Sequence, residues 1–107
     1  MAVRMTKPWT PVADALQGLH GQVGVFQLAD EQQNVIYIGY AGGRSLYGLK
    51  GEVKTQSEAL AAVRYVRVEI TTAYISRFRE LMMVHIADHG GPPAKNPPMK
   101  LGRLSPA

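Results

Sequence analysis

Two short apolar segments, each with an aromatic residue and a glycine, constrain this chain more than any other feature. The first is Gly-Val-Phe at residues 24–26, and the second, after ten intervening residues, is Tyr-Ile-Gly at residues 37–39. The residues around them favour β-strands over 23–29 and 35–40, and the polar stretch 30–34 is typical of a turn. The sequence therefore predicts an antiparallel β-hairpin in which two aromatic rings lie side by side.

The chain after the hairpin shows two helical patterns separated by a strand pattern. Residues 45–62 contain helix-forming residues behind a serine that can cap the helix. Residues 65–71 alternate between polar and apolar side chains, as half-buried strands do. Residues 72–89 place apolar side chains on one stripe of a long helix, which ends before the Gly-Gly-Pro-Pro of residues 90–93. We therefore expect an α/β (α+β) domain of ββ-α-β-α order, with a three-stranded antiparallel or mixed sheet flanked by helices.

The length of 107 residues is sufficient for one domain with one modest core. Hydrophobic residues make up 46% of the chain and charged residues 19%, which favours a folded protein over a disordered one. We expect a single domain over residues 1–107, with residues 1–20 as an N-terminal arm anchored by Trp9 and residues 92–107 as a proline-rich C-terminal tail.

Three absences exclude classes of protein. The chain has no cysteine, which excludes disulfides and thiolate metal sites. No apolar run reaches the ~20 residues that a membrane-spanning helix needs. The N-terminal residues lack the apolar segment of a secretory signal. We therefore expect a soluble, cytoplasmic protein with no membrane partner.

The positive charge is concentrated in the middle of the chain. The net charge is +4, and residues 44–79 carry seven Lys and Arg side chains against three Glu. Basic surfaces attract phosphate backbones, although an ordinary solvated surface is the alternative. This segment supplies four candidate contacts to nucleic acid: Lys50, Lys54, Arg64 and Arg67.

The order of these features resembles the GIY-YIG nuclease superfamily. The matching features are the two hairpin motifs, an arginine after the second motif (Arg44), a third strand, a helix that carries Glu80, and an asparagine after that helix (Asn96). They cover roughly two-thirds of the chain. Phe26 departs from the pattern, because the family usually has a tyrosine at this position. Members of the family cut phosphodiester bonds in nucleic acid.

The resemblance implies a role for each matching residue. Tyr37 takes part in activating the nucleophile, Arg44 steadies the phosphate, and Glu80 holds one divalent metal ion, Mg²⁺ or Mn²⁺. Asn96 becomes a further contact to nucleic acid. The residue types suit this chemistry, since Mg²⁺ accepts one carboxylate together with waters and phosphate. An arginine binds two phosphate oxygens at once, and a tyrosine hydroxyl can relay a proton if a neighbour lowers its pKa from ~10.

Three functions follow as hypotheses. The first is a metal-dependent endonuclease-like domain, with DNA favoured over RNA as the partner. The second is a catalytically degenerate domain that binds nucleic acid without cutting it, because Phe26 lacks a hydroxyl and Arg44 lies only five residues after Gly39. The third is a protein-interaction or dimerisation module that uses Trp9, the Met82-Met83 pair and the proline-rich tail, with a homodimer as one form of it.

Individual residues also have purely structural interpretations. Tyr37 can pack across the hairpin, and Glu80 can form a helical ion pair with Arg77, three residues earlier. His85, Asp88 and His89 have a spacing that can bind a metal ion. Packing of His85 in the apolar stripe and a helix-dipole interaction of His89 are the favoured alternative.

Overall fold

The strand at residues 24–29 is the centre of the fold, because its side chains are buried on both faces of a sheet. The computed structural model describes residues 4–96, and all six residues of this strand, β2 (Gly24–Ala29), are buried. The sheet has the order β1-β4-β2-β3, and every strand pair is antiparallel. The other strands are β1 (Thr10–Pro11), β3 (Val35–Ala41) and β4 (Tyr65–Ile70). Strand β3 is therefore an edge strand.

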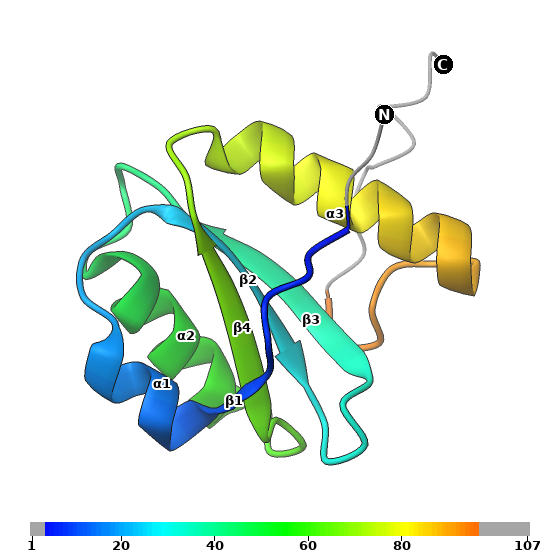
Figure 1. The fold of residues 1–107 in the computed structure, drawn as a ribbon, viewed down its shortest axis with the longest axis horizontal. Coiled ribbons are helices and arrows are strands. Elements are labelled where there is room, and N and C mark those ends of the chain that lie inside the picture. Colours follow the sequence, from blue (N-terminus) through cyan, green and yellow to red (C-terminus); the bar gives the residue numbers. More distant parts are fainter. Residues whose placement is uncertain (1–3, 97–107) are drawn as a thin grey trace.

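Helices cover both faces of the sheet (Figure 1). Helices α1 (Val12–Gly18) and α2 (Gly48–Ala59) lie on one face, and α3 (Tyr74–His89) lies on the other. No helix within the described residues is long and apolar enough to span a membrane.

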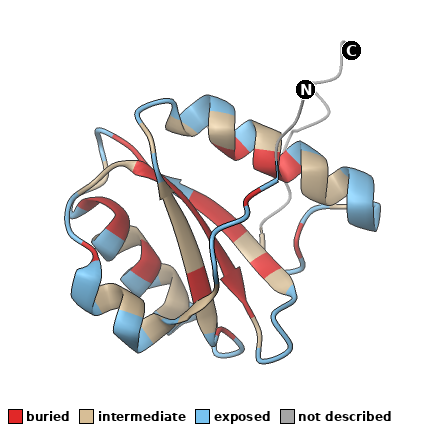
Figure 2. Cartoon of the chain, in the orientation of Figure 1, coloured by how far each residue is buried: buried red, intermediate tan, exposed pale blue. Residues whose placement is uncertain are grey.

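Alternation along β2 supplies both halves of the core. Phe26 and Leu28 join the cluster under α1 and α2, which also contains Val53. Val25 joins the cluster under α3, together with Leu81. Figure 2 shows the resulting band of buried residues through the strands and along the inner sides of the helices. The expected hydrophobic stripe of the long helix is thus the part of α3 that packs on the sheet.

The α+β fold with a helix-flanked antiparallel sheet is confirmed, but the predicted three-stranded sheet is wrong. The described elements follow the order β-α-β-β-α-β-α, because the expected N-terminal arm contributes β1 and α1. Strand β1 pairs Thr10 with Val66 and Pro11 with Tyr65. The alternative of a mixed sheet is also wrong, since no parallel pair occurs among the described strands. Of the expected tail, residues 97–107 lie outside the described residues.

Gly39 creates the space that two aromatic rings occupy. Phe26 pairs with Gly39 across the hairpin, and Tyr37 lies diagonally on the same face. The rings of Phe26 and Tyr37 stack with their centroids 6.0 Å apart and their planes at 29°. A Cβ atom on Gly39 would lie 2.6 Å from Cζ of Phe26 and 2.9 Å from Cε2 of Tyr37. The glycine of the second hairpin motif is therefore required by the packing of the two rings.

We expect Gly39→Ala to lower the free energy of unfolding by about 1–3 kcal/mol, because the added methyl group overpacks the two rings. Urea denaturation measures this change. Gly43→Ala is the matched control, since nothing lies within 4 Å of its added Cβ. Equal unfolding midpoints for the two variants would refute this role of Gly39.

Candidate functional site

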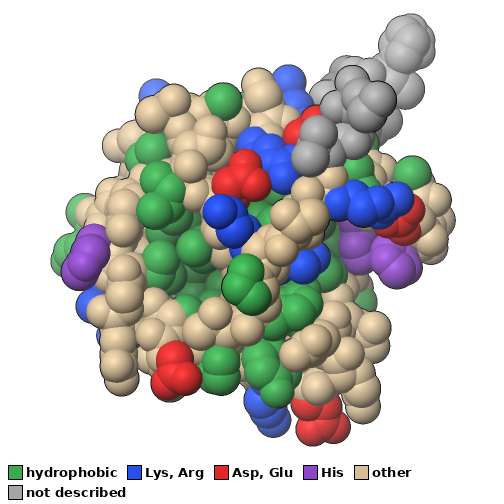
Figure 3. Space-filling model, in the orientation of Figure 1, with side chains coloured by type: hydrophobic (Ala, Val, Ile, Leu, Met, Phe, Trp, Pro, Cys, Tyr) green, Lys and Arg blue, Asp and Glu red, His purple; other side chains and the backbone are tan. Residues whose placement is uncertain are grey.

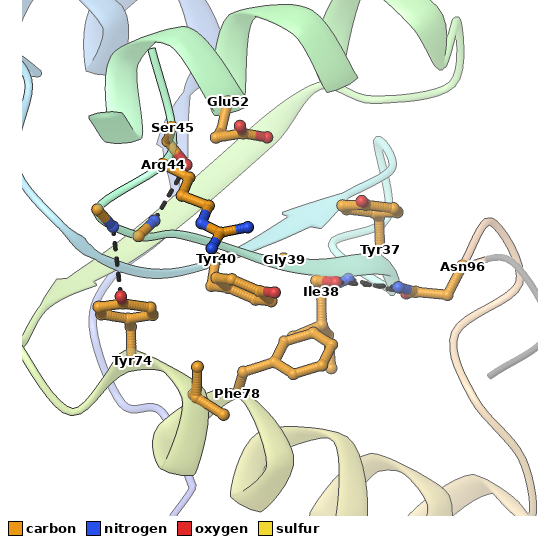
Figure 4. Close-up of a pocket in the computed structure, with 13 residues that line it drawn as sticks. Tyr37, Ile38, Gly39, Tyr40, Arg44, Ser45, Glu52, Tyr74, Phe78 and Asn96 are labelled. Atoms are coloured by element: carbon orange, nitrogen blue, oxygen red, sulfur yellow. Dashed lines mark hydrogen bonds between the residues drawn. The ribbon is translucent and has the colours of Figure 1, made fainter. Parts of the chain in front are cut away.

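A cavity lies beside the edge strand β3. It has a volume of about 780 Å³ and is lined by residues of β3, the loop after it, and the helices α2 and α3 (Figure 4). Three residues singled out from the sequence line it: Tyr37, Arg44 and Asn96. We call this cavity the β3 pocket, and the residues that line it are the candidate site.

The loop that carries Arg44 is held by hydrogen bonds to two hydroxyl groups. The backbone N–H of Gly42 donates to Oγ of Ser45 over 3.0 Å, and the N–H of Gly43 donates to the hydroxyl of Tyr74 over 3.3 Å. Gly42 has no room for a side chain, because a Cβ would lie 2.5 Å from the ring of Tyr74. The loop is therefore fixed between β3 and the start of α3.

Arg44 is exposed and extends over the pocket from this loop (Figure 4). Within residues 4–96 no ion pair involves its guanidinium group. The fork of the guanidinium group thus remains available to an anionic ligand.

The sequence interpretation missed the aromatic wall of the β3 pocket. Tyr40 stacks on Tyr74, with ring centroids 5.8 Å apart and planes at 21°. Phe78 contacts the same ring in a T-shaped arrangement, with ring centroids 5.1 Å apart and planes at 64°. Tyr40 is still 42% exposed, so part of its ring faces the pocket. Its position in β3, two residues after Ile38 and therefore on the face of α3, was the available signal.

The hydroxyl of Tyr37 is held in its neutral form. Burial raises the pKa of Tyr37 above its ordinary value, and the negative charges of Glu52 and of ionised Tyr40 raise it further. Proton relay by this residue was expected to require a lowered pKa, and that condition is not met. The phenol is suited to donating or accepting a hydrogen bond from its neutral state.

Glu80 lies outside the β3 pocket. Its carboxylate accepts a hydrogen bond from Nη1 of Arg77 over 2.5 Å. Arg77 also binds Glu69, through Nε at 2.8 Å and Nη2 at 3.1 Å. The structure therefore places Glu80 in an ion-pair cluster between α3 and β4 and does not bring it to Tyr37 and Arg44.

Glu80, which the resemblance gives as the metal ligand, is engaged by an arginine. Its carboxylate already binds the cation of Arg77, and Glu52 is the carboxylate that lines the pocket. Nowhere in residues 4–96 do three or more His, Cys, Asp or Glu side chains gather to hold an ion. This includes His85, Asp88 and His89, whose spacing could bind a metal ion but for which structural roles were favoured; Asp88 binds Arg4.

Two of the predicted nucleic-acid contacts have structural partners. Arg67 donates from Nε to the side chain of Gln27 over 2.7 Å, and its guanidinium carbon lies 4.2 Å from the ring centroid of Trp9. Arg67 thereby fastens the N-terminal arm to the sheet. Arg64 donates to the backbone carbonyls of Ala61 and Val63. Both arginines lie outside the β3 pocket.

Lys50 and Lys54 are exposed but turn away from the pocket. Lys50 and Lys54 are each two positions from Glu52, which lines the pocket. Two positions correspond to roughly 200° around the helix, so both lysines lie on the side opposite Glu52. On the face seen in Figure 3, Lys and Arg side chains are scattered among Asp and Glu rather than gathered in one patch. The predicted basic residues therefore do not form one surface with the pocket.

Asn96 closes the outer edge of β3 beside the pocket. Its Oδ1 accepts from the N–H of Ile38, and its Nδ2 donates to the carbonyl of Ile38, both over 2.9 Å. The N–H of Lys95 donates to the carbonyl of Ile36 over 2.8 Å. These bonds satisfy groups that an edge strand leaves unpaired. The side chain of Asn96 therefore positions β3.

We expect Asn96→Ala to expose the backbone of Ile38, so that its amide exchanges with solvent about fivefold faster, as the loss of one hydrogen bond worth ~1 kcal/mol implies. Hydrogen-exchange NMR measures this rate. Asn34→Ala, in the exposed hairpin turn, is the matched control. An unchanged exchange rate at Ile38 would contradict the positioning role.

We expect Tyr37→Phe to reduce the loss of stability at alkaline pH. The raised pKa of Tyr37 means that its stabilisation is complete below the unfolded value of ~10 and is lost as pH rises through the folded value. Urea denaturation at pH 8 and 11 tests this, with Tyr47→Phe as the control for removing an exposed hydroxyl. The account fails if both variants lose stability with pH as the wild type does.

Comparison with known proteins identifies one family, and that family's description names no activity. The model of the family described as Domain of unknown function (DUF7508) matches residues 3–88, from the N-terminal arm to the last turn of α3. No curated protein and no solved structure matches the chain. The function therefore has to be inferred from the β3 pocket.

Proposed function

We propose that this chain, which belongs to the family of the domain of unknown function DUF7508, binds nucleic acid in the β3 pocket and does not cut it. Among the three hypotheses, this is the degenerate nucleic-acid-binding domain. The resemblance of the hairpin motifs to GIY-YIG domains supports nucleic acid as the partner.

One observation carries the proposal. Tyr37 and Arg44, which the motif order singled out separately, line one pocket together with the exposed ring of Tyr40. An arginine fork binds phosphate oxygens, an aromatic ring stacks on bases, and a neutral phenol forms hydrogen bonds with sugar or base. Charge, aromatic surface and hydrogen-bonding groups together match the chemistry of a nucleotide.

Three features favour binding over hydrolysis. The carboxylate of Glu80 is engaged by Arg77 outside the pocket. The raised pKa of Tyr37 disfavours its use as a base near neutral pH. Phe26 is 1% exposed and supplies no hydroxyl. No catalytic step through Mg²⁺ or Mn²⁺ is therefore part of the proposal.

Dimerisation finds less support in the contacts of the residues expected to mediate it. Met82 is fully buried on the side of α3 that packs on the sheet, and only its neighbour Met83 is exposed, at 51%. Trp9 is covered on one side by Arg67. The homodimer stays a prediction, and nucleic-acid binding is the function that the pocket favours.

We expect Arg44→Gln to weaken binding of a fluorescein-labelled mixed-sequence 12-mer by about tenfold, since a charge-assisted hydrogen bond to phosphate contributes roughly 1.5 kcal/mol. Fluorescence anisotropy at 50 mM salt measures the dissociation constant. Arg79→Gln is the matched control, because it removes the same charge from an exposed position outside the pocket. Equal weakening in both variants would point to long-range charge instead of the pocket.

The same oligonucleotides should remain intact when they are incubated with the protein and Mg²⁺ or Mn²⁺. Metal-dependent cleavage that is lost in Glu80→Gln would overturn the proposal in favour of the endonuclease hypothesis. Absence of binding to any oligonucleotide at 50 mM salt would refute both.

A further inference from the structure

We infer that the β3 pocket takes an unpaired nucleotide of a single strand, with its base against Tyr40 and one phosphate at Arg44. The inference rests on the proposed function and specifies the form of nucleic acid that the pocket admits. Three properties of the pocket lead to it: an aromatic ring in its wall, a single Lys or Arg among its described lining residues, and a carboxylate.

The ring of Tyr40 is held in the wall of the pocket and remains partly exposed. Tyr74 and Phe78 support it from α3, and the fixed loop of Gly42 and Gly43 flanks it. In a duplex the faces of the bases are covered by their neighbours, so the ring of Tyr40 can stack only on a base that is free to leave the stack. The volume of about 780 Å³ falls in the range of ~300–1,000 Å³ in which proteins enclose small ligands. That range suits individual nucleotides.

Arg44 is the one Lys or Arg side chain among the described residues that line the pocket. Duplex binding through the backbone requires several cations that follow the phosphates. Lys50 and Lys54, the nearest such candidates in α2, face roughly 200° away from the pocket residue Glu52. The pocket therefore provides for one phosphate.

Glu52 restricts where a phosphate can lie in the pocket. Its carboxylate lines the pocket from α2 and is near enough to Tyr37 to raise the pKa of that phenol. A second phosphate beside it would meet a like charge. The phosphate is therefore placed at Arg44, and the uncharged base lies against Tyr40.

The test compares one sequence as a labelled 12-nucleotide single strand and as a blunt duplex, in DNA and in RNA, by fluorescence anisotropy. We expect the single strand of at least one of the two chemistries to bind at least tenfold more tightly than its duplex. Tyr40→Leu should weaken binding of that strand at least fivefold, whereas Tyr40→Phe, which keeps the ring, should stay within twofold of the wild type.

The salt dependence of the association constant is a further test, made on the wild-type protein and on Arg44→Gln. Because one phosphate is neutralised, the logarithm of the association constant should fall with the logarithm of salt concentration with a slope of about −0.7, and Arg44→Gln should flatten that slope. A slope several times steeper would overturn the inference.

The outcomes separate this inference from the proposed function. Equal affinity for single strand and duplex, with Arg44→Gln still weakening both, would refute the unpaired nucleotide but retain nucleic-acid binding. Loss of affinity in Tyr40→Phe equal to that in Tyr40→Leu would exclude base stacking on the ring. No binding of any probe would refute both proposals.

Discussion

The packing of Phe26 and Tyr37 over Gly39 is the contact on which the site depends. It aligns β2 with β3 in one register and turns the ring of Tyr37 toward α2, where burial and Glu52 raise its pKa. A one-residue slip of β3 would move every side chain of the strand to the other face. Tyr40 would then leave its contacts with α3. The glycine of the second motif therefore fixes Tyr37 and Tyr40, the two pocket tyrosines of β3, at once.

The pocket is preorganised because separate segments meet at the edge of β3. Asn96 satisfies the backbone of Ile38 from outside the sheet, and Tyr74 binds the loop that carries Arg44. Each of these contacts joins residues more than 30 positions apart in the sequence. Preorganisation lowers the entropy cost of ordering a site when a ligand binds, so a pocket with one cation can still hold a nucleotide.

Periodicity predicted most of the fold, because β4 alternates with the period of a strand and α3 buries one stripe of apolar side chains. It missed β1, whose two residues are strand only through their pairing with β4. The candidate site was harder to predict. Charge alone does not separate Arg44, which extends over the pocket, from Arg67, whose partners Gln27 and Trp9 come from distant segments. The helical pattern of residues 72–89 placed Glu80 off the apolar stripe but carried no information about which side of α3 meets the pocket.

Chemical-shift mapping of the ¹⁵N-labelled protein during titration with a single-stranded oligonucleotide tests the central claim most directly. If nucleic acid binds in the β3 pocket, the amides of Tyr40, Gly43 and Arg44 shift together and saturate at one dissociation constant. Shifts confined to the outer side of α2, around Lys50 and Lys54, would contradict the account, because they would place nucleic acid on the exposed basic side chains and leave the pocket without a role in binding.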